Sequence, residues 1–288
     1  MPYSINNTNR TYPSLLVHLE MGRVNTGLLR VAADLAAQFK SRVMGMALCQ
    51  PILVDYGDGY VDFELIETNR RDIARQVADA EAEFRAAFQG LSGSHVELSW
   101  RSAVLTTALA DEMATQARTA DLILTTDPSG DSLDGSRNLS RSALILQAGR
   151  PVLMVPPALG GLRLQHALIA WQDTRECRRA VSDALPLLQW AGRVSVAEIG
   201  PPEGLARSTE RLADVTAWLR SHGVQAEALP TAANGSDTAL QLKRIAQALR
   251  AELIVAGAYG HSRLREWALG GVTRDLLTQA EGCTLLSH

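Results

Sequence analysis

Short apolar runs alternate with helix-period segments along the chain. The run Leu15–Leu19 is followed by apolar residues spaced three and four apart between residues 28 and 39, and a second such segment spans residues 66 to 88. That spacing is typical of amphipathic helices, and continuous apolar runs fit strands buried on both faces of a parallel sheet. We therefore predict an α/β fold in which crossover helices connect parallel strands.

This pattern occurs twice in the same order. The matching segments of the two halves are residues 15–20 and 167–172, 42–47 and 193–198, 120–124 and 251–255, and 151–155 and 283–286. Internal self-similarity of this kind indicates repeated structural units. We predict two copies of a βαβαβαβαβ unit.

The halves are separated by residues 156–161, which read Pro-Pro-Ala-Leu-Gly-Gly. Prolines cannot donate ladder hydrogen bonds and glycines loosen the chain, so we place the boundary here, with domains at 1–158 and 159–288. The first half has about 20 extra residues, Gln50 to Asn69, between its second strand and second helix. We interpret them as a surface insertion, with a lid or partner surface as the alternative.

Composition excludes some classes of function. The chain has 288 residues, 46% of them hydrophobic, and a net charge of -3, which does not favour binding to nucleic acid or to an anionic membrane. It contains no apolar stretch long enough to span a bilayer and no leader pattern at its start, so we expect a cytoplasmic protein. The isolated residues Cys49, Cys177 and Cys283 are expected to be packing thiols, and no metal-ligand spacing occurs.

The strongest candidate site follows the fourth strand of the second half. Ligands of open α/β sheets bind outside the carboxyl ends of the strands, at the switch point of the strand order. Here Gly257, Gly260 and Gly270 follow a G-x2-G-x9-G pattern, and His261 and Arg263 lie between them. Glycines allow close approach of the backbone, and free amides at a helix start favour phosphate.

This pattern, followed by Val272 and Thr273, resembles the universal stress protein family, and two copies resemble its tandem branch. The resemblance implies two Rossmann-like domains of the adenine nucleotide alpha hydrolase type. Each would have a five-stranded parallel sheet of order 3-2-1-4-5 with helices on both faces. Many members bind ATP, which Mg²⁺ can accompany. They carry an acidic residue at the end of the first strand and Ser or Thr after the third glycine.

The second half departs from this family pattern at two positions. Gln172 stands at the acidic position, with Asp173 next, and Gly271 stands where Ser or Thr is usual. A neutral amide can still hydrogen-bond an adenine or ribose edge. The expected nucleotide-binding residues are Gln172, Asp173, Gly257, Gly260, His261, Arg263, Gly270, Gly271, Val272 and Thr273.

Two neighbouring residues have alternative interpretations. Asp173 with Glu176 three residues later also fits a helix N-cap and its capping-box partner. Trp171 either packs in the core, which we favour, or stacks on a base.

The first half is a weaker candidate for binding nucleotide. Glu20 occupies the acidic position, but the loop at residues 126–138 lacks G-x-x-G and has three aspartates against one arginine. Like charges there oppose phosphate binding. We expect a degenerate loop and a structural role for this half.

Three functions are therefore compared. We favour a non-enzymatic stress-response protein that binds ATP in its second half and acts as a sensor or regulator of an unknown protein partner. The alternative is a nucleotide-free scaffold. In either case, the resemblance to related single-domain proteins that dimerise by this edge implies an intrachain pseudo-dimer in which residues 152–155 pair with 284–287. Whether the chain also forms a homodimer is left open by the sequence. An enzyme is least favoured because only Asp173 and His261 are candidate bases, and His18 and His166 look like packing residues.

Overall fold

The computed structural model describes residues 11–51, 63–90, 96–126, 137–258 and 282–288. In the first half, strands and helices alternate as predicted. Their bounds are β1 (Ser14–Leu19), α1 (Thr26–Phe39), β2 (Arg42–Cys49), α2 (Phe63–Phe88), β3 (Leu98–Val104), α3 (Leu109–Gln116), β4 (Leu122–Thr126), α4 (Arg141–Gln147) and β5 (Val152–Val155).

The second half repeats this order within its described residues. Its bounds are β6 (His166–Ala170), α5 (Arg175–Asp183), α6 (Leu185–Trp190), β7 (Arg193–Gly200), α7 (Leu205–Ser221), β8 (Ala226–Ala232), α8 (Thr238–Leu249), β9 (Leu253–Gly257) and β10 (Cys283–Ser287). The helix expected between β9 and β10 lies outside the described residues.

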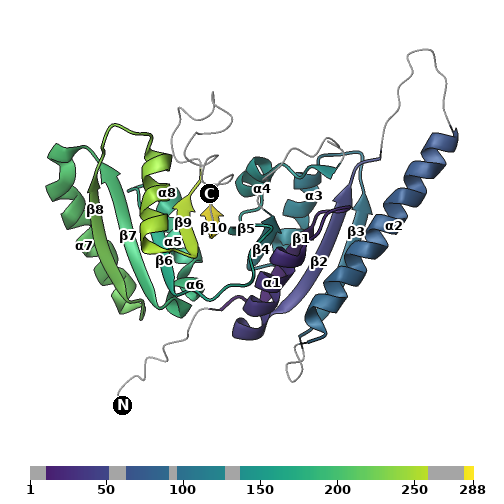
Figure 1. Cartoon of the computed structure of the whole chain (residues 1–288), viewed down its shortest axis with the longest axis horizontal. Helices are drawn as coiled ribbons and strands as arrows, with labels where there is room; N and C mark the ends of the chain where they lie inside the picture. Colours follow the sequence, from purple (N-terminus) through teal and green to yellow (C-terminus); the bar gives the residue numbers. More distant parts are fainter. Residues whose placement is uncertain (1–10, 52–62, 91–95, 127–136, 259–281) are drawn as a thin grey trace, which may run out of the picture.

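All ten strands form one sheet of order β3-β2-β1-β4-β5-β10-β9-β6-β7-β8 (Figure 1). Pairing is parallel within each half, and each half has the predicted order 3-2-1-4-5. The halves meet where β5 pairs antiparallel with β10, with Leu153 opposite Leu285. The predicted pairing of residues 152–155 with 284–287 is thereby confirmed.

Helices cover both faces of this sheet. Because side chains alternate across a strand, Leu15 and Val17 pack on the face covered by α1, α2, α5, α6 and α7, here called the α1/α7 face. Leu16 packs on the opposite face with α3, α4 and α8, here called the α3/α8 face. Each face has a hydrophobic cluster with members from both halves, so the two halves share their core.

Side chains also connect the halves directly. The Tyr12 hydroxyl donates to the Asp183 carbonyl over 2.7 Å. The Phe39 ring lies edge-to-face with Tyr12 and with Trp190, at centroid distances of 5.3 and 6.1 Å. The connecting segment packs on α1 as well, because the Leu162 amide donates to the Asp34 carboxylate over 2.8 Å. These contacts hold the two halves together beyond the strand pairing.

One expectation about the first half needs correction. The segment Gln50 to Asn69 was expected to be a loop insertion, but α2 already begins at Phe63. Part of the extra length therefore extends a helix of 26 residues, against 17 in α7. The physical reason is that an extra helical turn satisfies its own backbone hydrogen bonds, whereas a loop does not.

The cysteines and two histidines are packing residues, as predicted. All three cysteines lie within the described residues, are buried and form no disulfide, and burial raises the pKa of Cys177 to about 11 and of Cys283 to about 12. His18 and His166 are buried, and His166 Nε2 lies 2.8 Å from the Ser195 hydroxyl. Within the described ranges, no helix is both long enough and apolar enough to cross a membrane.

The shared core predicts that the halves unfold together. Leu285 is fully buried where β5 meets β10, so Leu285→Ala should lower the free energy of unfolding by about 2–5 kcal/mol. It should shift one cooperative transition in urea. Leu240→Ala is the matched control because Leu240 is 43% exposed, and it should change stability by less than about 0.5 kcal/mol. Two separate transitions, with only one shifted, would contradict a shared core.

Candidate functional site

Two of the predicted site residues lie side by side at the switch point of the second half. Gln172 follows β6 and Gly257 ends β9, and these strands are neighbours, with Ala170 opposite Ala256. Asp173 follows Gln172 in the same loop. The other predicted residues lie outside the described residues: Gly260, His261, Arg263, Gly270, Gly271, Val272 and Thr273.

The Gln172 side chain is exposed at this strand end. Its backbone N–H donates to Cys177 Sγ over 3.4 Å, which ties the loop to the first turn of α5. The side-chain carboxamide of Gln172 makes no hydrogen bond to any residue that the structure describes. A donor and an acceptor are therefore presented to solvent from this position.

The N-cap of α5 is Thr174, which corrects the assignment to Asp173. Thr174 is extended, with φ -123° and ψ 160°, and its hydroxyl accepts from the Cys177 amide over 3.3 Å. Asp173 instead pairs with Arg178 over 2.7 Å, and both side chains are more than half exposed. The sequence offers two capping residues in succession, and the packing of α5 selects the second.

Gly257 is required by the close approach of α5 to the end of β9. A Cβ atom at this position would lie 2.4 Å from the Cys177 amide nitrogen and 2.8 Å from its Cα. These are backbone atoms of the first turn of the helix, which cannot move aside cheaply. The first glycine of the motif therefore has a packing role, whatever it does for a ligand.

Trp171 belongs to the core, as favoured from the sequence. It is 8% exposed and packs in the hydrophobic cluster of the α1/α7 face. The side chain therefore contributes to packing, and it also borders a cavity between α5 and α7.

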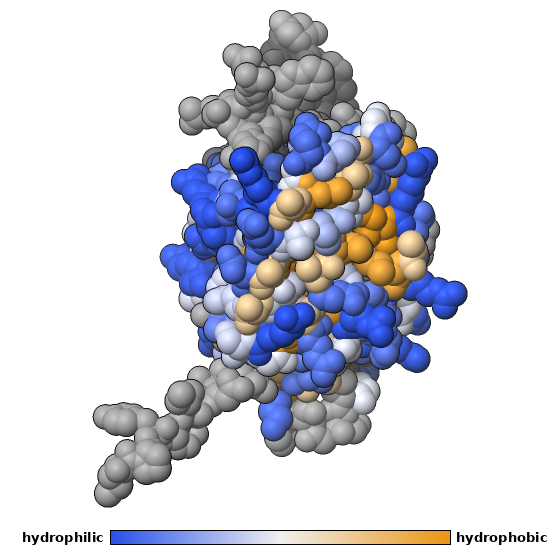
Figure 2. All heavy atoms as spheres, turned by 90° about the vertical axis from the view of Figure 1, so that its left-hand side faces the viewer, coloured by the Kyte–Doolittle hydropathy of each residue, from blue (hydrophilic) through white to orange (hydrophobic). Residues whose placement is uncertain are grey.

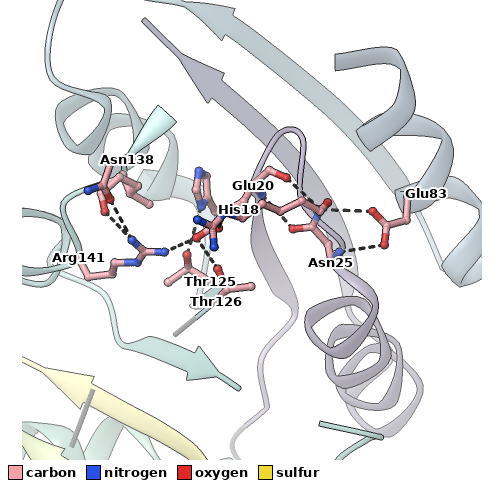
Figure 3. Close-up of polar contacts among 10 residues, drawn as sticks. His18, Glu20, Asn25, Glu83, Thr125, Thr126, Asn138 and Arg141 are labelled. Carbon is pink, nitrogen blue, oxygen red and sulfur yellow. Dashed lines mark hydrogen bonds and ion pairs between the residues drawn. The ribbon is translucent and has the colours of Figure 1, made fainter. Parts of the chain in front are cut away.

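In the first half, the equivalent acidic residue is held by protein groups (Figure 3). Glu20 Oε1 accepts from the Thr126 hydroxyl over 2.6 Å and from the guanidinium of Arg141 at the start of α4. Its other oxygen lies 3.5 Å from Arg23. The side chains of Glu20 and Arg141 are only 16% and 10% exposed. The sequence analysis did not single out Thr126 or Arg141. Thr126 ends β4, as Gly257 ends β9 in the second half, and Arg141 begins the helix that follows the loop.

Asn25 fixes the backbone that carries Glu20 (Figure 3). Its side-chain oxygen accepts from the Glu20 amide over 2.9 Å, and its NH₂ group donates to the Glu20 carbonyl over 3.1 Å. The backbone N–H of Asn25 donates to the Glu83 carboxylate of α2 over 3.0 Å. The loop after β1 is thus tied to α2, and Glu20 is held toward Arg141.

His18 lies beneath this ion pair. It is fully buried, and Nδ1 is 3.2 Å from the Thr125 hydroxyl. Burial, and to a smaller extent the positive charge of Arg141, lower the pKa of His18 to about 4, while the Glu20 carboxylate opposes this shift. The imidazole is therefore neutral near pH 7.

Solved structures with this fold include universal stress proteins. One from Archaeoglobus fulgidus DSM 4304 matches with a TM-score of 0.74 and 11% identity, over 98% of each chain. A protein of unknown function from Pseudomonas aeruginosa PAO1 matches with a TM-score of 0.58 and 16% identity, over 96% of this chain and 92% of that one. A provisionally named universal stress protein from Pseudomonas aeruginosa UCBPP-PA14 matches with a TM-score of 0.58 and 18% identity, over 96% of this chain and 93% of that one.

No family model and no curated protein matches the sequence. The structural matches cover both halves of the chain. The chain therefore has the Rossmann-like fold of universal stress proteins, in a two-unit arrangement.

The packing role of Gly257 can be measured. Gly257→Ala should lower the free energy of unfolding by about 1–3 kcal/mol because the new methyl group meets the α5 backbone. Gly200→Ala is the matched control, since Gly200 also ends a strand and a Cβ there would meet nothing within 4 Å. Urea denaturation of both variants gives the comparison. Equal stabilities would show that α5 does not constrain Gly257.

The buried His18 predicts a pH dependence of stability. Its folded pKa of about 4 lies below the unfolded value of 6.5, so the unfolded chain takes up the proton first as pH falls. The stabilisation is complete above pH 6.5 and is lost as pH falls toward 4. In this window, unfolding free energy should fall more steeply for the wild type than for His18→Gln, by up to about 1.4 kcal/mol per pH unit.

The measurement is urea denaturation at several pH values in that window. His166, whose pKa burial also lowers, is present in both proteins and cancels in the difference. Parallel pH profiles for the two proteins would refute the assignment to His18.

Proposed function

We propose that this chain is a tandem universal stress protein that binds an adenine nucleotide, ATP, in its second half and acts as a non-enzymatic sensor or regulator. The observation that carries this proposal is the contrast between Gln172 and Glu20. Both follow the first strand of their half. One presents an exposed side chain, and the other is engaged by neighbouring side chains.

The contrast matters because a ligand must compete with existing partners. A nucleotide that reached Glu20 would have to displace Thr126 and Arg141 from a largely buried carboxylate, and breaking such a pair costs several kcal/mol. At Gln172, an adenine or ribose edge would displace no hydrogen-bond partner that belongs to the described residues. The neighbouring strand end carries Gly257 in place of Thr126, which removes a side chain from the same place.

The remaining part of the proposed site is the loop after β9. Backbone amides at Gly260, Gly270 and Gly271 would bind phosphate oxygens, and Val272 and Thr273 would open the following helix. His261 and Arg263 add donors and positive charge, and Mg²⁺ could bridge the phosphates. Asp173 lies at the rim, next to Gln172. In this proposal residues 159–288 form the binding domain and residues 1–158 the structural one.

A nucleotide-free scaffold is the second candidate. It is supported by the pairing of β5 with β10, which makes one ten-stranded sheet from both halves without any ligand. Because these two strand edges are already paired, a homodimer or a protein partner would have to use another surface.

The test measures binding directly. The full chain is purified, any released ligand is identified by mass after denaturation, and ATP is titrated into the stripped protein by calorimetry with and without Mg²⁺. We expect one nucleotide per chain. Gly260→Val should weaken binding at least about tenfold because a branched side chain obstructs the phosphates. Gly130→Val, in the corresponding first-half loop, is the matched control and should bind as the wild type does.

Two results would contradict the proposal. Unchanged affinity in Gly260→Val, with the wild-type melting temperature, would remove the loop from the site. The absence of both a released ligand and binding heat at millimolar ATP would favour the scaffold.

A further inference from the structure

A cavity lies between α5 and α7, next to the strand-end site, because Trp171 and Asp173 belong to its lining. Its volume is about 450 Å³, within the range of small-molecule sites. Eight residues line it: Trp171, Asp173, Arg178, Val181, Arg211, Asp214, Val215 and Trp218. It opens on the α1/α7 face, where Trp171 and Val181 pack. Figure 2 views the end of the molecule that carries α7 and β8, where apolar residues show between charged ones.

The cavity is a feature of the second half. In the first half, α1 and α2 contact each other. Phe84 of α2 is fully buried there and packs against Phe88 and Trp100 at centroid distances of 5.2 and 5.6 Å. The corresponding helices α5 and α7 instead flank open space. Within the described residues, aromatic side chains therefore pack under α2 in the first half, whereas a cavity lies between α5 and α7 in the second.

The walls of the cavity are aromatic and aliphatic. Trp171 and Val181 are 8% and 2% exposed and form its inner side. Trp218 is 39% exposed at the rim, where its ring packs edge-on against His222 at 4.3 Å. Tryptophan faces attract organic cations more strongly than other side chains do.

The lining itself holds two carboxylates and two guanidiniums, and Glu198, which pairs with Arg211 from outside the lining, adds a third carboxylate. Arg178 is paired with Asp173 over 2.7 Å, and Arg211 with Glu198 over 2.6 Å. Asp214 is exposed, and within the described part of the chain its carboxylate forms neither an ion pair nor a hydrogen bond. Both cations of the lining are thus neutralised, and one carboxylate is left beside two tryptophans.

We propose that this cavity binds a small organic cation, an amine with an aromatic or aliphatic body. The body would lie against Trp171 and Trp218, and the ammonium group would lie near Asp214. An anion of the same shape would meet Asp214 and two guanidiniums that already have partners. The cavity shares Asp173 with the rim of the proposed nucleotide site, whereas Asp214 and Trp218 do not belong to that site.

The test compares two probes of nearly equal shape and opposite charge. Phenethylamine and 3-phenylpropionate are titrated into the full chain, and binding is followed by calorimetry and by tryptophan fluorescence. We expect the amine to bind at least about tenfold more tightly than the acid. Asp214→Asn should weaken binding of the amine about threefold to tenfold, and Trp218→Ala should do the same.

Two further variants make the test specific. Glu210→Gln removes the same charge from an exposed position on α7 outside the cavity, and it should leave amine binding unchanged. Asp214→Lys should reverse the preference in favour of the acid. Melting temperatures check that each variant folds.

Several outcomes would overturn the proposal: equal affinity for both probes, no binding of the amine, or equal effects of Asp214→Asn and Glu210→Gln. ATP titration of Asp214→Asn separates the two sites. We expect Asp214→Asn to bind ATP as the wild type does and to bind the amine more weakly. Loss of both ATP binding and amine binding would show that the two ligands share one site.

Discussion

Backbone hydrogen bonding between β5 and β10 is the interaction on which the rest of the molecule depends. Each strand would otherwise be an open edge of a five-stranded sheet, with unpaired donors and acceptors. Their antiparallel pairing places Leu153 against Leu285 and continues both faces of the sheet from one half to the other. Tyr12, Phe39 and Trp190 then close the α1/α7 face across the same joint. The helices of each half therefore pack on a common core.

The two halves differ at the position that follows their first strand. In the first half, Glu20 is bonded by Thr126 and Arg141, above a neutral His18. In the second half, Gln172 is exposed beside Gly257. The pair of Glu20 and Arg141 is costly to break, because removal of one partner would leave a largely buried charge. The same division appears between the helices, where Phe84 fills a layer that is hollow between α5 and α7.

Sequence reasoning was accurate where the signal is periodic and failed where it depends on which atoms meet. The spacing at residues 28–39 and 66–88 located α1 and α2, because an amphipathic helix needs an apolar residue on every turn. The start of α2 and the N-cap of α5 were misplaced. Asp173 and Thr174 are both good caps, and the choice depends on how α5 seats against β9 at Gly257.

The sequence by itself determined the fold class and the duplication, since both follow from local periodicity and repeated order. The strand order, its switch point and the strands that join the halves were implied by the resemblance to a known family. Only the tertiary structure decided what the strand-end residues do. Arg141 reaches Glu20 from 121 residues away, and no local pattern records that contact. The cavity beside Trp171 likewise exists because α5 and α7 stand apart on the sheet. The distance between two helices depends on how all the core side chains pack together, and the spacing of apolar residues along the sequence does not record this.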